Sequence, residues 1–89
     1  MLDRAFALHP QVALRPEPFG ALAYHYGNRK LTFLKHPDIV RVVRSLGEQP
    51  TLRDALITAG IAEGRWPMFE RAIEALVDSE MVGERALVG

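Results

Sequence analysis

The chain has 89 residues, enough for one compact domain, and 48% of them are apolar, enough to fill one core. We therefore predict a single domain over residues 1–89. Eleven Lys and Arg balance eleven Asp and Glu, so the overall charge gives no reason to expect tight binding to nucleic acid. Cysteine is absent, which excludes disulfides, thiol nucleophiles and cysteine-ligated metals. No stretch resembles a membrane span or a signal region, so the expected location is the cytoplasm, with no membrane partner.

Alternating apolar and polar residues predict two strands early in the chain. The first covers residues 11–15, and it ends or becomes a sheet edge at Pro16 and Pro18, because proline cannot donate to a ladder. The second covers residues 21–26, where Leu22, Tyr24 and Tyr26 alternate with Ala23 and His25, as is typical of a pleated surface. The secondary structure of residues 1–8, ahead of both strands, is ambiguous. Phe6 and Leu8 are expected to anchor this segment on the core.

A tight hairpin turn is predicted at Gly27 and Asn28, since both residues tolerate a positive φ. Residues 30–34 then form the returning third strand. Near Lys35 the apolar period changes from that of strands to that of helices.

Three helices follow the strands. The first begins at Pro37, a residue suited to a first turn, and stops at Gly47. The second begins at a Thr51 cap and ends at Gly60, and the third covers residues 67–80. The predicted fold class is α+β, with a three-stranded antiparallel sheet followed by three helices, and the tail from about residue 83 is expected to fray.

Residues that could support catalysis are poorly placed. Ser45 and Ser79 lie in helical patterns with no nearby histidine or sharp glycine turn to activate them. His9, His25 and His36 match no metal-ligand spacing, and they are interpreted as structural. There is no glycine-rich phosphate loop either. We therefore predict a protein that is not an enzyme and uses no cofactor.

The third predicted strand has an open edge, because the last strand of a three-stranded meander pairs on one side only and leaves one row of its N–H and C=O groups unpaired. No proline or inward charge protects residues 30–34, as usually happens at an exposed edge. An extended peptide could pair with this edge as an added strand. The other interpretation, that the N-terminal segment or a loop covers the edge, stays open at the level of sequence.

Charge is unevenly distributed in this neutral chain. Residues 29–44 contain five cations and one anion, a net charge of +4, whereas residues 67–80 contain one cation and four anions, a net charge of −3. The apolar stripe of the third helix is first of all a core face, although part of it could border a groove beside the third strand. Trp66 has the same two interpretations, as a recognition anchor or as part of the core.

The segments LHPQVALRPEPFGALAYHYG at residues 8–27 and RKLTFL at residues 29–34 closely resemble the mycofactocin biosynthesis chaperones. These are precursor-peptide recognition elements related to the pyrroloquinoline quinone peptide chaperones. The resemblance spans roughly residues 2–82 and is looser in the third helix. It implies a winged-helix-like domain with the sheet at the N-terminus and the helices behind it.

The resemblance also implies a function. The domain would bind the leader of an acidic, ribosomally made precursor peptide as a strand added beside the third strand, and present it to a radical S-adenosylmethionine (radical SAM) maturase. The implied pairing edge is Leu31, Thr32, Phe33 and Leu34; the implied opposite wall is Met68, Phe69, Ala72 and Ile73; the implied electrostatic partners of the peptide are Arg29, Lys30, Lys35 and Arg41.

Two alternatives belong to other functional classes. A winged-helix DNA-binding regulator would share the same order of elements. Its recognition helix would here carry a net charge of −3 toward the phosphates, which argues against nucleic acid as a partner. The third strand could also pair with its own copy, so that the expected monomer would become a strand-exchanged dimer.

Overall fold

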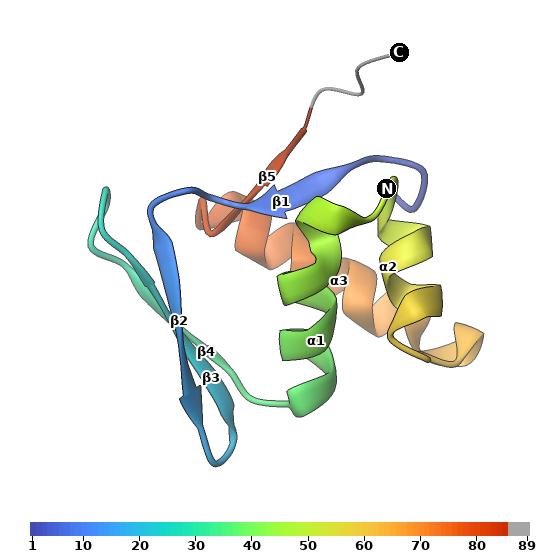
Figure 1. Ribbon diagram of the computed structural model, residues 1–89, viewed down its shortest axis with the longest axis horizontal. Helices are drawn as coiled ribbons and strands as arrows, with labels where there is room; N and C mark the ends of the chain where they lie inside the picture. Colours follow the sequence, from blue (N-terminus) through green and yellow to red (C-terminus); the bar gives the residue numbers. More distant parts are fainter. Residues whose placement is uncertain (86–89) are drawn as a thin grey trace.

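A computed structural model describes residues 1–85 of the chain. These residues form five strands, three α-helices and two short 3₁₀ helices. Figure 1 shows how the strands and α-helices are arranged. In chain order they are β1 (Phe6–Leu8), β2 (Val12–Glu17), β3 (Gly20–His25), β4 (Leu31–Leu34), α1 (Pro37–Ser45), η1 (Leu46–Glu48), α2 (Leu52–Thr58), η2 (Glu63–Arg65), α3 (Trp66–Asp78) and β5 (Val82–Glu84).

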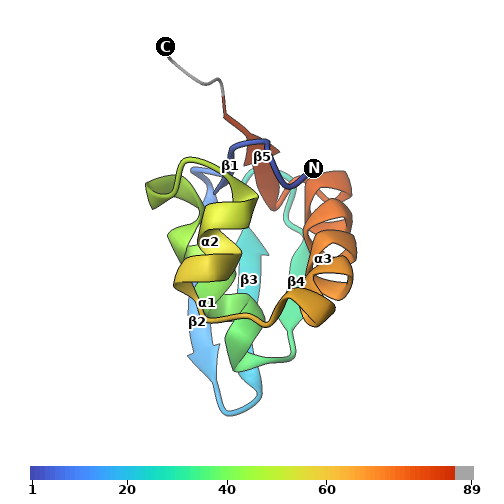
Figure 2. The ribbon, with the colours of Figure 1, turned by 90° about the vertical axis from the view of Figure 1, so that its right-hand side faces the viewer.

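The main sheet is antiparallel, with strand order β2-β3-β4. It forms one layer, and the three helices lie on one side of it (Figure 1). Viewed from the side, α3 runs alongside the β4 edge (Figure 2). The α+β class, with a three-stranded antiparallel sheet followed by three helices, is confirmed.

The inner face of β3 is made of small side chains. Ala21 and Ala23 are completely buried there, and the buried His25 continues the same face. Alanine leaves room for α1 to pack closely on the strand, while the larger Leu22 and Tyr24 point to the outer face of the sheet. Alternation in β3 is therefore read correctly from the sequence, with the smaller residues on the core side.

The β3–β4 turn differs from the prediction. The residue with a positive φ is Arg29, at 61°, and neither Gly27 nor Asn28 adopts this conformation. Gly27 leaves room for its neighbours, because a Cβ atom at this position would crowd the side chain of Gln11 and would lie 2.7 Å from Cε1 of the buried His25. The prediction for the prolines is confirmed: β2 lies at an edge of the sheet, continues through Pro16 opposite Ala21, and ends at Glu17, just before Pro18.

The helix boundaries follow the predicted start and stop signals. Pro37 opens α1, and the hydroxyl of Thr51 accepts the N–H of Asp54 at 3.2 Å as the cap of α2. Gly60 adopts a φ of 75° just beyond α2, a conformation that suits glycine at the end of a helix. The third helix ends at Asp78, close to the expected limit.

The segment expected to fray begins with an ordered strand. In β5, Val82 pairs with Leu8 and Glu84 pairs with Phe6, so β1 and β5 form a second, two-stranded sheet (Figure 1). Arg85 extends this contact: its Nε donates to the carbonyl of Phe6 at 2.9 Å, and its Nη2 donates to that of Leu46 at 3.2 Å. The prediction of fraying is therefore wrong for residues 83–85, and for residues 86–89 it lies outside the described part of the chain. The predicted anchors hold, since Phe6 is buried in the core and Leu8 packs against it.

We predict that Arg85→Ala lowers the free energy of unfolding by about 1–3 kcal/mol, because it leaves half-buried carbonyls without a charged donor. Urea unfolding followed by circular dichroism measures the change. Arg44→Ala is the matched control, since Arg44 is exposed and should shift stability by less than about 0.5 kcal/mol. Equal stability of the two variants would show that Arg85 does not hold β1 and β5 to the rest of the fold.

Candidate functional site

A groove of about 760 Å³ lies between β4 and α3. One wall comes from β4 and the residues that follow it, and the other from α3. Ala72 and Ala75 contribute only methyl groups to the helical wall, which leaves space in front of β4. The lining residues are Thr32, Phe33, Leu34, Lys35, His36, Ile39, Arg65, Met68, Phe69, Ala72, Ala75, Leu76 and Ser79.

Within residues 1–85, the strand β4 pairs with β3 and with no other strand. The N–H of His25 donates to the carbonyl of Lys30 at 3.0 Å, one position beyond the last facing residues of the ladder, Tyr24 and Leu31, so residue 30 directs its carbonyl to β3. Hydrogen-bonded pairs alternate along an antiparallel ladder, so Thr32 and Leu34 also direct their backbone groups to β3. Leu31 and Phe33 consequently direct their N–H and C=O groups outward, to the open edge.

One end of the groove is held by the hairpin turn. The side-chain amide of Asn28 donates to the carbonyl of Ser79 at 3.4 Å and to the carboxylate of Glu80 at 3.2 Å. These bonds connect the start of β4 to the end of α3. They set the separation of the two walls at this end.

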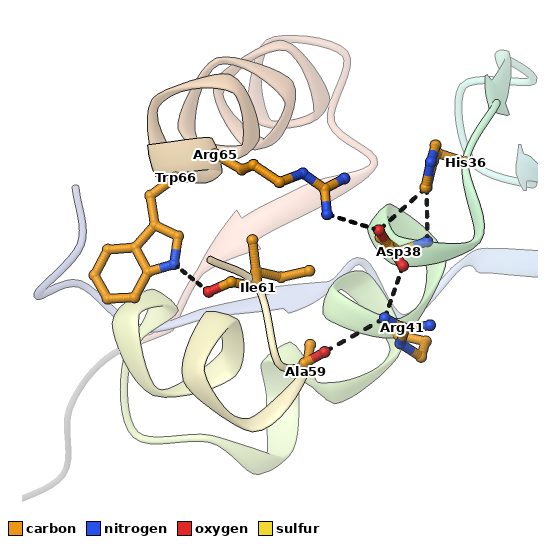
Figure 3. A network of polar contacts seen from close by, with 7 residues as sticks. All are labelled: His36, Asp38, Arg41, Ala59, Ile61, Arg65 and Trp66. Carbon is orange, nitrogen blue, oxygen red and sulfur yellow. Dashed lines mark hydrogen bonds and ion pairs between the residues drawn. The ribbon is translucent and has the colours of Figure 1, made fainter. Parts of the chain in front are cut away.

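The other end is held by Asp38 in the first turn of α1 (Figure 3). Its carboxylate accepts Nη1 of Arg65 at 3.0 Å and Nη2 of Arg41 at 2.7 Å. Arg65 stands just before α3, so this ion pair joins α1 to α3. The guanidinium of Arg65 also lies 5.3 Å from the centre of the Phe69 ring, a cation–π contact on the wall of the groove.

The hydrogen bond from Arg65 holds the pKa of the Asp38 carboxyl below its ordinary value, an effect that desolvation opposes and the charge of Arg41 reinforces. Nδ1 of His36 accepts the backbone N–H of Asp38 at 3.1 Å and caps α1. The same nitrogen lies 3.5 Å from Oδ2 of Asp38, whereas Arg41 and Arg65 are the partners that are always charged.

Seven residues predicted for the site do line this groove. They are Thr32, Phe33, Leu34, Lys35, Met68, Phe69 and Ala72. Phe33 and Met68 are well exposed, at 57% and 54%, so they remain accessible to a ligand. The two predicted walls are thus brought together by the fold.

Five predicted residues lie elsewhere. Ile73 is fully buried in the core, so the prediction that it forms part of the wall is wrong. Arg41 is engaged with Asp38 and with the carbonyl of Ala59, and it does not line the groove. The other three, Arg29, Lys30 and Leu31, are exposed in the turn and at the start of β4, outside the lining.

Six lining residues were missed at the level of sequence: His36, Ile39, Arg65, Ala75, Leu76 and Ser79. Helical spacing could have found those in α3, because positions 72, 75, 76 and 79 share one helix face with Met68. No local signal marks Arg65, which lies in η2 and reaches the groove only through the path of the chain. Trp66, left open between anchor and core, is a core residue whose indole N–H donates to the carbonyl of Ile61 at 2.9 Å (Figure 3).

The three histidines all serve the backbone. Nδ1 of His9 accepts the N–H of Gln11 at 3.0 Å, and Nδ1 of His25 accepts that of Gly27 at 2.9 Å. His36 caps α1 in the same manner. These contacts explain the histidines as turn and cap residues.

Known proteins of one family are similar to this chain over most of its length. The family model of the MftB peptide chaperones matches residues 5–83. The peptide chaperone MftB of Mycolicibacterium smegmatis (strain ATCC 700084 / mc(2)155) is 50% identical over 80 residues, which cover 90% of this chain and 78% of the relative. The peptide chaperone MftB of Mycobacterium tuberculosis (strain ATCC 25618 / H37Rv) is 47% identical over 83 residues, covering 93% and 76%.

This chain belongs to the MftB peptide chaperone family. A third MftB relative, from Mycobacterium ulcerans (strain Agy99), is 49% identical over 80 residues, covering 90% of this chain and 73% of the relative. Membership of this family confirms the predicted resemblance, and it favours a peptide chaperone over an enzyme and over a DNA-binding regulator. No solved structure matches the chain. Among the helices of residues 1–85, none has the length and apolar character needed to cross a membrane.

The Asp38 network gives a pH-dependent prediction. A carboxyl whose pKa is lowered by folding contributes stability above its unfolded pKa of about 3.9 and loses this contribution as the pH falls through the folded value. Asp38→Asn should therefore be less stable than the wild type at pH 7, and the difference should shrink below about pH 4. Urea unfolding at a series of pH values measures both.

Asp78→Asn is the control for this experiment, because Asp78 is exposed on α3 and forms no ion pair with residues 1–85. It should have little effect at either pH. A stability gap for Asp38→Asn that stays constant from pH 7 to pH 2 would contradict the assigned role of the carboxylate.

Proposed function

We propose that this protein binds the leader of the mycofactocin precursor peptide as a strand added to β4, and holds the precursor for a radical SAM maturase. The observation that carries the proposal is the open edge of β4 facing a groove of about 760 Å³. Family membership supports the peptide-chaperone role, and the resemblance noted above supports the choice of precursor and enzyme.

Strand addition suits the geometry of the edge. Leu31 and Phe33 together offer two N–H donors and two C=O acceptors, each of which can form a bond worth about 1 kcal/mol net. Main-chain bonding of this kind tolerates varied peptide sequences. The side chains of an added strand alternate, so that every second one enters the groove between Leu34 and Leu76.

The groove holds only a short stretch of peptide, because β4 has four residues. The rest of the precursor would remain outside and accessible to the maturase. Cations around the groove, among them Lys35, Arg65 and the turn residues Arg29 and Lys30, favour an acidic precursor and would accelerate its association. A monomer is the binding form in this proposal, because a strand-exchanged dimer through β4 would occupy the same edge.

Amide hydrogen exchange followed by NMR tests the pairing residue by residue. On addition of the mycofactocin precursor leader, the amides of Leu31 and Phe33 should exchange at least about tenfold more slowly, because they acquire acceptors. The amides of Thr32 and Leu34 should change less, since they already bond to β3. Uniform protection of α3 without any change in β4 would exclude strand addition.

A substitution on the groove tests the same proposal through affinity. Phe33→Asp should weaken leader binding about tenfold or more, because an apolar contact worth roughly 1.5 kcal/mol is replaced by a charge that repels an acidic peptide. Fluorescence anisotropy with a labelled leader measures the dissociation constant. Ile57→Asp is the control, because Ile57 has the same 57% exposure on α2 and does not line the groove.

Both variants should keep the helical circular dichroism of the wild type, since both side chains are largely exposed. Equal affinities for Phe33→Asp and Ile57→Asp would contradict the proposed site. Absence of any binding of the leader to the wild type would overturn the proposed function itself.

A further inference from the structure

The α1 end of the groove has more cations than anions. Two guanidinium groups, those of Arg41 and Arg65, share the single carboxylate of Asp38. Lys35 adds another charge on the lining and forms no ion pair within residues 1–85. A ligand entering this end therefore meets a net positive charge.

Arg65 is held in position by its neighbours and still has N–H donors that can bind a ligand. Its Nη1 faces Asp38, the carboxylate that pairs with it within the described chain, and its guanidinium stacks on Phe69. A guanidinium has five N–H donors in a rigid fork, so one carboxylate leaves others available. The side chain is 40% exposed and lines the groove, so these donors can reach a bound ligand.

Apart from Asp38, the acidic residues near Arg65 in sequence do not neutralise this position. Glu63 and Glu70 form no ion pair with Arg65 and do not line the groove. At the opposite end, Ser79 is the lining residue, and the acidic Asp78 and Glu80 beside it are balanced by Arg29 and Lys30 of the hairpin turn. The two ends of the groove consequently differ in charge, with the cationic end at Arg65.

We propose that Arg65, assisted by Lys35, forms a carboxylate subsite that receives one Asp or Glu side chain of the bound peptide. This inference rests on the proposed function and adds a determinant of specificity to it. Backbone pairing alone allows a strand to slip along its partner by two residues with little change in its bonds. A single acidic side chain at the end of the groove would select one register.

A double-mutant cycle tests the subsite with a fluorescein-labelled mycofactocin precursor leader. Each Asp or Glu of the leader is replaced in turn by Asn or Gln, and binding is measured by anisotropy to the wild type and to Arg65→Gln. One leader position should lose about fivefold in affinity on the wild type, as expected for roughly 1 kcal/mol from a charged pair. That same replacement should cost almost nothing on Arg65→Gln.

Arg71→Gln is the matched control, because it removes the same charge from α3 at an exposed position outside the groove. It should leave the affinity and the effect of every leader replacement unchanged. Arg65→Lys should retain part of the coupling, since the charge stays and the fork is lost. Lys35→Gln leaves the Asp38 ion pairs intact and should reduce the effect of replacing the same leader residue. This variant tests the subsite if Arg65→Gln loses its helical circular dichroism.

The outcomes separate the two proposals. If the wild type binds the leader but every acidic replacement has the same small effect on the wild type, Arg65→Gln and Arg71→Gln, the charges only steer association and the subsite is excluded. If the wild type does not bind the leader, the proposed function fails before the subsite is reached. Coupling confined to Arg65 and one leader position would establish the subsite.

Discussion

The hydrogen-bonding groups of β4 are satisfied on one side only, and the fold keeps its other side open. Residues 31 and 33 direct their backbone groups away from β3, into a space that α3 borders but does not close. Soluble proteins usually protect such an edge with prolines, charges or a covering segment. Here the protection is limited to the charges that flank the strand, and the unused pairing capacity of the backbone coincides with an apolar groove. The candidate site is the place where these two features meet.

The groove depends on contacts at its two ends more than on its lining. Asn28 links the hairpin to the end of α3, and Asp38 links α1 to Arg65 at the start of α3. Between these ties, Ala72 and Ala75 leave the helical wall recessed. A groove whose walls are already held apart requires little rearrangement of the protein on binding. The entropy cost of binding then comes mainly from ordering the flexible peptide.

Much of the candidate site could be predicted from the sequence, and the errors of that prediction have a physical explanation. The resemblance to a known family selected the strand that contains Phe33 and the helix that contains Phe69. It could not tell which residues of the apolar stripe of α3 border the groove, because Ile73 and Leu76 have the same chemistry and both follow helical spacing. Core packing buries Ile73 completely, while Leu76, also buried, reaches the groove. Arg65 was missed because a residue in a short 3₁₀ turn has no periodicity that assigns it to a face.

By itself the sequence determined the features that depend on neighbours along the chain. Alternation placed β2 and β3, the hairpin turn placed β4 as the return strand, and caps and stop residues set the limits of the helices, since these signals act over a few residues. Only the tertiary structure decided the pairing of β1 with β5, the ion pairs that converge on Asp38, and the distance between β4 and α3. Each of these joins segments that are distant in sequence, and such contacts depend on how the whole core packs.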